Sequence, residues 1–193
     1  MNLLFRLLHL LVFHRTRSRV RPLDEVRTPF RVWPTDLDVN RHMTNGKYLS
    51  IMDLARVDLM LRCGLAGAIK RAGIYPVVAS QSIRYRRSLR LFARFNVTTR
   101  VVGWDEKFIF LVQTFERGGE TVASAVVKGI FLGKSGGRVA PMDVLALTDV
   151  AESAVELPAW VHQWVSSEDE MWRESARAAP ESDAATASKR KGL

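Results

Sequence analysis

A helix that is apolar on almost every side is the feature that most restricts the fold of this chain. Asn45 and Gly46 are typical of a helix start and Gly64 of a helix end, so the sequence predicts a helix over residues 47–63. A helix of this kind has to be enclosed by the rest of the protein. Its apolar side chains are spread nearly all round: Tyr48, Leu49, Ile51, Met52, Leu54, Ala55, Val57, Leu59, Met60 and Leu61.

After this helix the hydrophobic pattern changes to a period of two residues. Three alternating runs begin at Phe95, Phe108 and Val122, and each predicts an antiparallel strand. The turn-like stretches Gly103–Glu106 and Gly118–Gly119 separate the runs, which favours a meander over parallel crossovers. One enclosed helix beside a long antiparallel sheet predicts an α+β fold, in which a curved sheet wraps around the long central helix.

Length and composition limit the class of protein. The 193 residues fit one core domain, and a content of 47% hydrophobic and 25% charged residues argues against global disorder and against a polytopic membrane protein. Cys63 is the single cysteine, so no intrachain disulfide can form, which is compatible with a reducing compartment. We therefore expect a cytoplasmic protein, with a peripheral position at the inner face of the membrane as the open alternative.

The chain divides into four predicted segments. Residues 1–26 form an N-terminal amphipathic helix and a basic linker, and residues 27–150 form the core domain. A C-terminal helix is expected over residues 151–174, followed by a disordered tail over residues 175–193.

The N-terminal segment Met1–Phe13 is apolar except at Asn2, Arg6 and His9, which recur at helical spacing. It is too short to span a bilayer, which requires roughly 20 apolar residues. Two interpretations stay open. Residues 1–21 form an interfacial membrane anchor, or the helix docks on its own domain or on a dimer partner.

The net charge of +9 is distributed unevenly. Met1–Arg31 holds seven arginines against two acidic residues, and Ile83–Arg100 holds six arginines and no acidic residue. A solvated surface explains this, and so does a small anion such as a nucleotide-bearing group. Nucleic acid is not predicted as a partner, because no helix-turn-helix, zinc-finger or aromatic RNA-binding pattern is present.

Two other chemistries are rejected from the sequence. The four histidines have no zinc-ligand spacing, so we predict no metal and no cofactor. Gly133–Gly137 matches the Gly-x-Ser-x-Gly pattern of serine hydrolases, but a glycine-rich loop replaces the required turn from strand to helix.

The loop "DLDVNRH" concentrates titratable groups just before the central helix. In an extended stretch, its alternate polar side chains would project together to one side, and these are Asp36, Asp38, Asn40 and His42. The backbone amides at the helix start are suited to holding an oxyanion, and a carboxylate beside them could attack a carbonyl or activate water. The amides in question are those of Gly46, Lys47 and Tyr48. The structural alternative is that Asp36 and Asn45 cap turns and that His42 makes a packing hydrogen bond.

The stretch "DLDVNRHMTNGKYLSIMDLAR" resembles the signature of hotdog-fold acyl-CoA thioesterases of the 4-hydroxybenzoyl-CoA thioesterase-like type, and its loop is similar to that of plant acyl-carrier-protein thioesterases. The likeness covers roughly residues 27–132. It implies the hotdog fold and a homodimer or a higher oligomer of dimers, because hotdog sites lie at dimer interfaces.

The resemblance also implies roles for single residues. Asp38 matches the catalytic aspartate, with Asn40 and His42 at the next alternate positions. Supporting roles are expected for three further side chains: Asp36, Asn45 and Asp53. For Asp53, an ion pair with Arg56 is the alternative. Arg41 stands where many relatives have glycine.

The expected function is hydrolysis of acyl-CoA, or of acyl carrier protein thioesters, to free acid and thiol in fatty acid metabolism. Asp38 would act as general base or nucleophile. Four arginines are candidates for binding the CoA phosphates: Arg84, Arg86, Arg87 and Arg90. The alternative is a membrane-attached acyl-binding or scaffold protein with little turnover. Dehydratase or other hotdog chemistry fits the loop less well.

Overall fold

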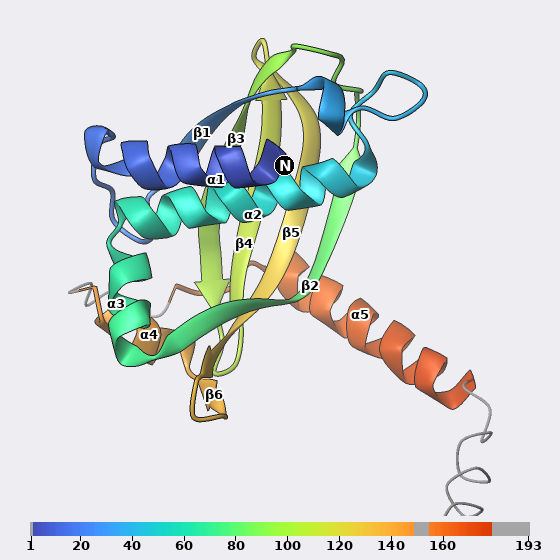
Figure 1. Cartoon of the computed structure of the whole chain (residues 1–193). Helices are drawn as coiled ribbons and strands as arrows, with labels where there is room; N and C mark the ends of the chain where they lie inside the picture. The colour runs from blue at the N-terminus through green and yellow to red at the C-terminus, as the bar shows by residue number, and fades with distance from the viewer. Residues whose placement is uncertain (1, 149–154, 179–193) are drawn as a thin grey trace, which may run out of the picture. The chain divides into compact units, whose positions relative to one another are not determined.

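The structure is a computed structural model that describes residues 2–148 and 155–178 (Figure 1). The chain falls into two compact units, Met1–Glu156 and Leu157–Leu193. In the second unit, helix α5 spans Ala159–Ala178. It starts later than the predicted helix over residues 151–174, and it includes residues 175–178, which we wrongly assigned to a disordered tail. Residues 151–154 and 179–193 of these predictions lie outside the described part.

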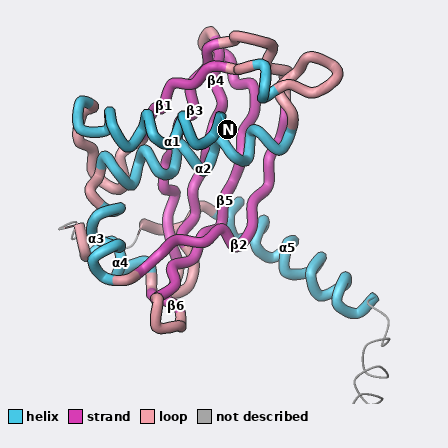
Figure 2. The backbone as a smooth tube through the Cα atoms, in the orientation of Figure 1, coloured by secondary structure: helices cyan, strands magenta, loops and turns pink. Residues whose placement is uncertain are grey.

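The first unit is built on an antiparallel sheet that curves across one side of helix α2 (Figure 2). Because β3, β4 and β5 are neighbours both in the chain and in the sheet, the predicted meander is confirmed. In spatial order the strands are β1 (Val26–Arg31), β3 (Arg94–Trp104), β4 (Ile109–Arg117), β5 (Glu120–Gly133) and β2 (Ile74–Tyr85), and β6 (Arg138–Val139) pairs with β5.

Helix α2 (Asn45–Arg62) is enclosed, as its all-round apolar pattern predicts. The inner surface of the sheet packs on one side of it, and helix α1 (Asn2–Phe13) lies alongside it, next to the edge strand β1 (Figure 1). Ile51, Met52 and Ala55 have no exposed surface. The remaining short elements of this unit are α3 (Leu65–Ala72), α4 (Pro141–Ala146) and the 3-10 helices η1 (His14–Thr16) and η2 (Pro34–Asp36).

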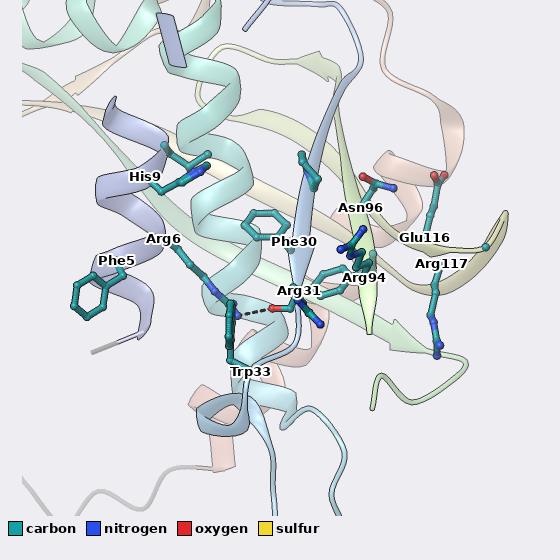
Figure 3. Close-up of a pocket in the computed structure, with 14 residues that line it drawn as sticks. Phe5, Arg6, His9, Phe30, Arg31, Trp33, Arg94, Asn96, Glu116 and Arg117 are labelled. Carbon is teal, nitrogen blue, oxygen red and sulfur yellow. Dashed lines mark hydrogen bonds between the residues drawn. The ribbon is translucent and has the colours of Figure 1, made fainter. Parts of the chain in front are cut away.

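Helix α1 is docked on its own domain, which is one of the two predicted arrangements. Leu10 is buried, and the Arg6 guanidinium donates to the Arg31 carbonyl oxygen at 2.7 Å (Figure 3). The same guanidinium lies 2.5 Å from Asp36 Oδ2. The polar stripe of α1 therefore turns Arg6 inward, toward the domain. None of the helices in the described ranges has the length and apolar character needed to cross a membrane.

A buried carboxylate fastens the C-terminal half of α2 to the chain that follows α1. Asp58 has no exposed surface, and its Oδ2 accepts hydrogen bonds from Arg17 Nη1 at 2.5 Å and from the Thr28 hydroxyl at 2.7 Å. Arg62 lies 3.8 Å from the same oxygen. A buried carboxylate requires such partners, so this cluster holds η1, β1 and α2 together.

Candidate active site

The loop between η2 and α2 forms a tight turn. Asp38 Oδ1 accepts hydrogen bonds from the backbone amides of Asn40 at 2.9 Å and His42 at 3.1 Å. The Asp38 amide donates to the His42 carbonyl oxygen at 2.8 Å. Arg41 has φ 59°, the left-handed conformation that glycine adopts most easily. We predicted that the alternate side chains of an extended loop would project together, which is wrong because the Asp38 carboxylate bonds its own backbone and bends the chain.

Asp36 faces helix α1 and the start of η2. Its side chain is 1% exposed, its Oδ2 accepts a hydrogen bond from the Trp33 amide at 2.8 Å, and Arg6 is its ion-pair partner. The Asp36 carboxylate thus caps a turn and anchors α1, which corresponds to the structural alternative for this residue.

A pocket of about 280 Å³ opens where the Asp38 loop, the start of α2 and the end of β2 meet. It brings together several residues that the sequence singles out, together with Met43, Tyr85 and Ser88. The full lining is Asp38, His42, Met43, Asn45, Tyr48, Tyr85, Arg86, Arg87 and Ser88. Seven other candidate site residues, all in the described part of the chain, do not line it: Asp36, Asn40, Gly46, Lys47, Asp53, Arg84 and Arg90.

The start of α2 differs slightly from the prediction. Thr44 is the N-cap residue and makes no side-chain capping hydrogen bond, so Asn45 is the first residue of the helix. The Lys47 amide donates to the Thr44 carbonyl oxygen at 2.9 Å and is thereby engaged. The Gly46 amide also lies in the first turn, where N–H groups have no acceptor within the helix. It is therefore the amide best placed, of the three considered, to bind an oxyanion.

Two tyrosines form one wall of the pocket. The Tyr48 and Tyr85 rings meet edge to face with centroids 5.0 Å apart, and Tyr48 also contacts Phe115 at 4.9 Å. Burial raises the pKa of Tyr48, which a backbone hydrogen bond from Leu89 partly opposes, and burial also raises the pKa of Tyr85. Both phenols therefore stay neutral near pH 7. The Tyr85 side chain was missed in the sequence, although it directly precedes the two pocket arginines.

Asp53 belongs to a different part of α2. Its side chain is 63% exposed and forms an ion pair with Arg56, as in the alternative considered for it. Arg56 Nη1 donates to the Oε1 atom of buried Gln113 at 2.6 Å. Burial lowers the pKa of Arg56, and the charge of Asp53 opposes that shift. Asp53 and Arg56 border a mainly apolar cavity of about 260 Å³ between α2 and strands β2 and β5.

A third hollow lies between α1 and the strands β1 and β3, with a volume of about 800 Å³ (Figure 3). Its walls are aromatic side chains and arginines, including Phe30, Trp33 and Arg94. Arg31 stacks over Trp33 at 5.8 Å and over Phe92 at 5.1 Å. None of the predicted catalytic residues lines this hollow.

A sequence profile for the Thioesterase-like superfamily matches residues 32–165, which contain the Asp38 loop, α2 and the whole sheet except β1. The chain belongs to this superfamily. It is 34% identical over 146 residues to protein THEM6 of Xenopus laevis, a match that covers 75% of this chain and 70% of that protein.

Two solved structures extend the comparison. The YbaW probable thioesterase from Escherichia coli is 25% identical with a TM-score of 0.56, over 63% of this chain and 97% of that one. A 4-hydroxybenzoyl CoA thioesterase mutant complexed with 4-hydroxybenzoyl CoA is 17% identical with a TM-score of 0.58, over 64% and 98% of the two chains, and shows the fold alone. The predictions of a hotdog fold and of a thioester hydrolase are confirmed.

Proposed function

We propose that this member of the superfamily is an acyl thioesterase that hydrolyses acyl-CoA to a free acid and CoA. The observation that carries the proposal is the pocket at the start of α2, where the Asp38 carboxylate, the His42 ring and the first turn of a helix meet. A carboxylate and an imidazole beside the positive end of a helix dipole can activate water and stabilise a developing oxyanion.

Asp38 is the proposed catalytic residue. Within the described part of the chain, its hydrogen bonds to backbone amides use Oδ1, which leaves Oδ2 to take a proton from water or to attack the thioester carbon. In the general-base route, the water oxygen bonds to the carbonyl carbon, the C–S bond breaks, and the sulfur leaves as CoA thiol. In the nucleophilic route, Asp38 Oδ2 bonds to the carbonyl carbon while the C–S bond breaks and CoA leaves as thiolate. Water then hydrolyses the mixed anhydride, which releases the acid and restores the carboxylate. Asn40 supports Asp38 through its backbone amide.

His42 and the helix start share the remaining work in this proposal. His42, which lines the same pocket, orients the water or the thioester. The Gly46 amide is the best of the three first-turn amides to polarise the carbonyl, since the Lys47 amide already has an acceptor.

The thiol carrier is recognised by arginines in this proposal. Arg86 and Arg87 line the pocket and are suited to the phosphates of CoA, or to an acidic acyl carrier protein. Arg87 also forms an exposed ion pair with Glu120 at 2.8 Å, which costs little to exchange for a phosphate. The acyl group, taken from fatty acid metabolism, would occupy the apolar cavity of about 260 Å³ beside β2.

We further propose a homodimer formed through β2. This strand is at the edge of the described sheet and spans 12 residues, with Tyr75 and Val78 exposed on it. A long open edge is a template for pairing with a second copy. A cytoplasmic location with peripheral membrane contact through residues 1–21 completes the proposal, supported by the free Cys63 and the exposed apolar side chains of α1.

The test is thiol release from short, medium and long acyl-CoAs, with matched acyl carrier protein thioesters run in parallel. We expect turnover of acyl-CoA at a rate that depends on acyl length. If only the acyl carrier protein thioesters are hydrolysed, the thiol carrier of the substrate is acyl carrier protein and not CoA. No release from either set would overturn the proposal in favour of the acyl-binding alternative.

A further inference from the structure

The outward side of α1 is a row of large apolar side chains. Arg6 and Leu10 face the domain, and most of the other large apolar residues of this helix are turned to the outside. We call the exposed set the apolar row, and its members are between 45% and 69% exposed: Leu4, Phe5, Leu8, Leu11, Val12 and Phe13. Single exposed apolar residues are ordinary on soluble proteins, but a contiguous patch of this kind marks an interaction surface.

The apolar row runs into a strongly basic cleft. This cleft, of about 1160 Å³, lies where η1, the end of α2 and α3 meet. Leu11 lines it and also belongs to the apolar row, so the two surfaces are continuous. No acidic residue is among its lining residues, and the basic ones are His14, Arg15, Arg17, Arg19, Arg62, Lys70 and Arg71.

Most of the positive charge in the basic cleft is uncompensated. Arg17 and Arg62 both form ion pairs with Asp58, so their charges are partly neutralised. Among the described residues no carboxylate lies within ion-pair distance of the other four cations: Arg15, Arg19, Lys70 and Arg71. Such a group of exposed cations attracts anions from solution.

We propose that the apolar row and the basic cleft together dock the protein on a bilayer that contains anionic phospholipid. The apolar row would enter the boundary between headgroups and acyl chains, while the cleft binds headgroup phosphates. The apolar row favours a bilayer over a soluble polyanion, because a polyanion would fill the basic cleft and leave six apolar side chains in water. This inference rests on the proposed peripheral contact of residues 1–21, to which it adds the lipid charge and the binding residues.

Helix α1 docks without leaving the domain. The contacts of Arg6 with Asp36 and with the Arg31 carbonyl oxygen hold it along α2, so the folded surface itself meets the lipid. The Asp38 pocket lies beside the first turn of α2, whereas the basic cleft lies at the last turn. Membrane binding and thioester hydrolysis can therefore be changed separately.

The experiment is co-sedimentation of the full-length protein with vesicles of phosphatidylcholine, alone or with 30% phosphatidylglycerol. The cleft variant is Arg15→Gln with Lys70→Gln, and its charge-matched control is Arg100→Gln with Lys107→Gln, all at exposed positions. The row variant is Leu4→Ser with Leu8→Ser. Circular dichroism, light scattering and thiol release from a soluble short-chain acyl-CoA are measured for each protein.

We expect the wild type to bind the anionic vesicles at least tenfold more tightly than the neutral ones, and to dissociate in 0.5 M salt. The cleft variant should bind anionic vesicles at least fivefold more weakly than wild type, and the affinity of the control should stay within twofold. The row variant should bind neither kind of vesicle. Thiol release should be unchanged in all of them, so a failure here is distinct from a failure of the thioesterase proposal.

Three results would overturn the inference. The first is wild type that stays in the supernatant at low salt, and the second is a cleft variant that binds like wild type. The third is a row variant that changes the oligomeric state instead of vesicle binding, since the row would then be covered by a second copy of the chain.

Discussion

One carboxylate lies in the loop before helix α2 and another lies near the end of this helix, and the two have opposite surroundings. At the C-terminal end, Asp58 has no exposed surface and is bonded to Arg17 and the Thr28 hydroxyl. At the N-terminal end, Asp38 is exposed in the pocket and bonded only to backbone amides within the described chain. The Asp58 carboxylate thus joins α2 to neighbouring segments, whereas Asp38 keeps its Oδ2 atom available to a substrate or water.

Removal of the charge at Asp58 should give the largest effect on stability. In Asp58→Asn, Arg17 and Arg62 lose their shared anion, so we expect the free energy of unfolding to fall by about 2–4 kcal/mol. Urea denaturation measures it. The control is Glu120→Gln, which removes an ion pair that is exposed on both sides and should cost about 0.5 kcal/mol or less. Equal effects of the two substitutions would contradict the contrast drawn between buried and exposed carboxylates.

The second prediction concerns Arg86 and Arg87, which line the pocket beside Asp38. Arg86→Ala with Arg87→Ala should raise KM for acyl-CoA about 3–10-fold at nearly constant kcat, because phosphate contacts hold substrate and transition state equally. Steady-state kinetics provide the test, with Arg100→Ala and Arg117→Ala as a control of equal charge. A KM that stays at the wild-type value would remove these arginines from the proposed CoA site.

Arg41 gives the smallest predicted effect. Its φ of 59° is strained for any residue with a Cβ atom, so Arg41→Gly should stabilise the fold by about 0.5–1 kcal/mol after the entropy cost of glycine. Arg90→Gly, at a residue without positive φ, should instead destabilise it. Thermal unfolding compares the two, and a loss of stability in Arg41→Gly would show that the side chain makes contacts that outweigh the strain.

Local pattern was enough to predict most of the fold. Three features depend only on short stretches of sequence, and the structure contains each of them. They are the helix with apolar residues on all sides, the strands with a period of two, and the turn at Gly118–Gly119. The end of the C-terminal helix was misplaced because a tail rich in alanine and charge has no strong stop signal before Ala178.

The site could be predicted only in part. Asp38, His42, Arg86 and Arg87 line one pocket, and their roles in catalysis and CoA binding stay predictions. Asp36 was grouped with them because its ion-pair partner Arg6 lies 30 residues away in the chain. Asp58 was overlooked as one polar position in an apolar helix, and its partner Arg17 is 41 residues distant. Contacts of that range are set by packing, which no local pattern specifies.

The most direct test of the account is thiol release by Asp38→Asn beside Asp105→Asn. The two aspartates are matched, because Asp105 Oδ1 also accepts two backbone amides, from Lys107 and Phe108, both at 2.7 Å. Asparagine can keep these hydrogen bonds but is a poor base and nucleophile. We predict that Asp38→Asn lowers kcat by about 100-fold or more with fold and oligomeric state intact, while Asp105→Asn leaves kcat unchanged. An Asp38→Asn protein within about threefold of wild-type kcat would contradict the assignment of catalysis to this carboxylate.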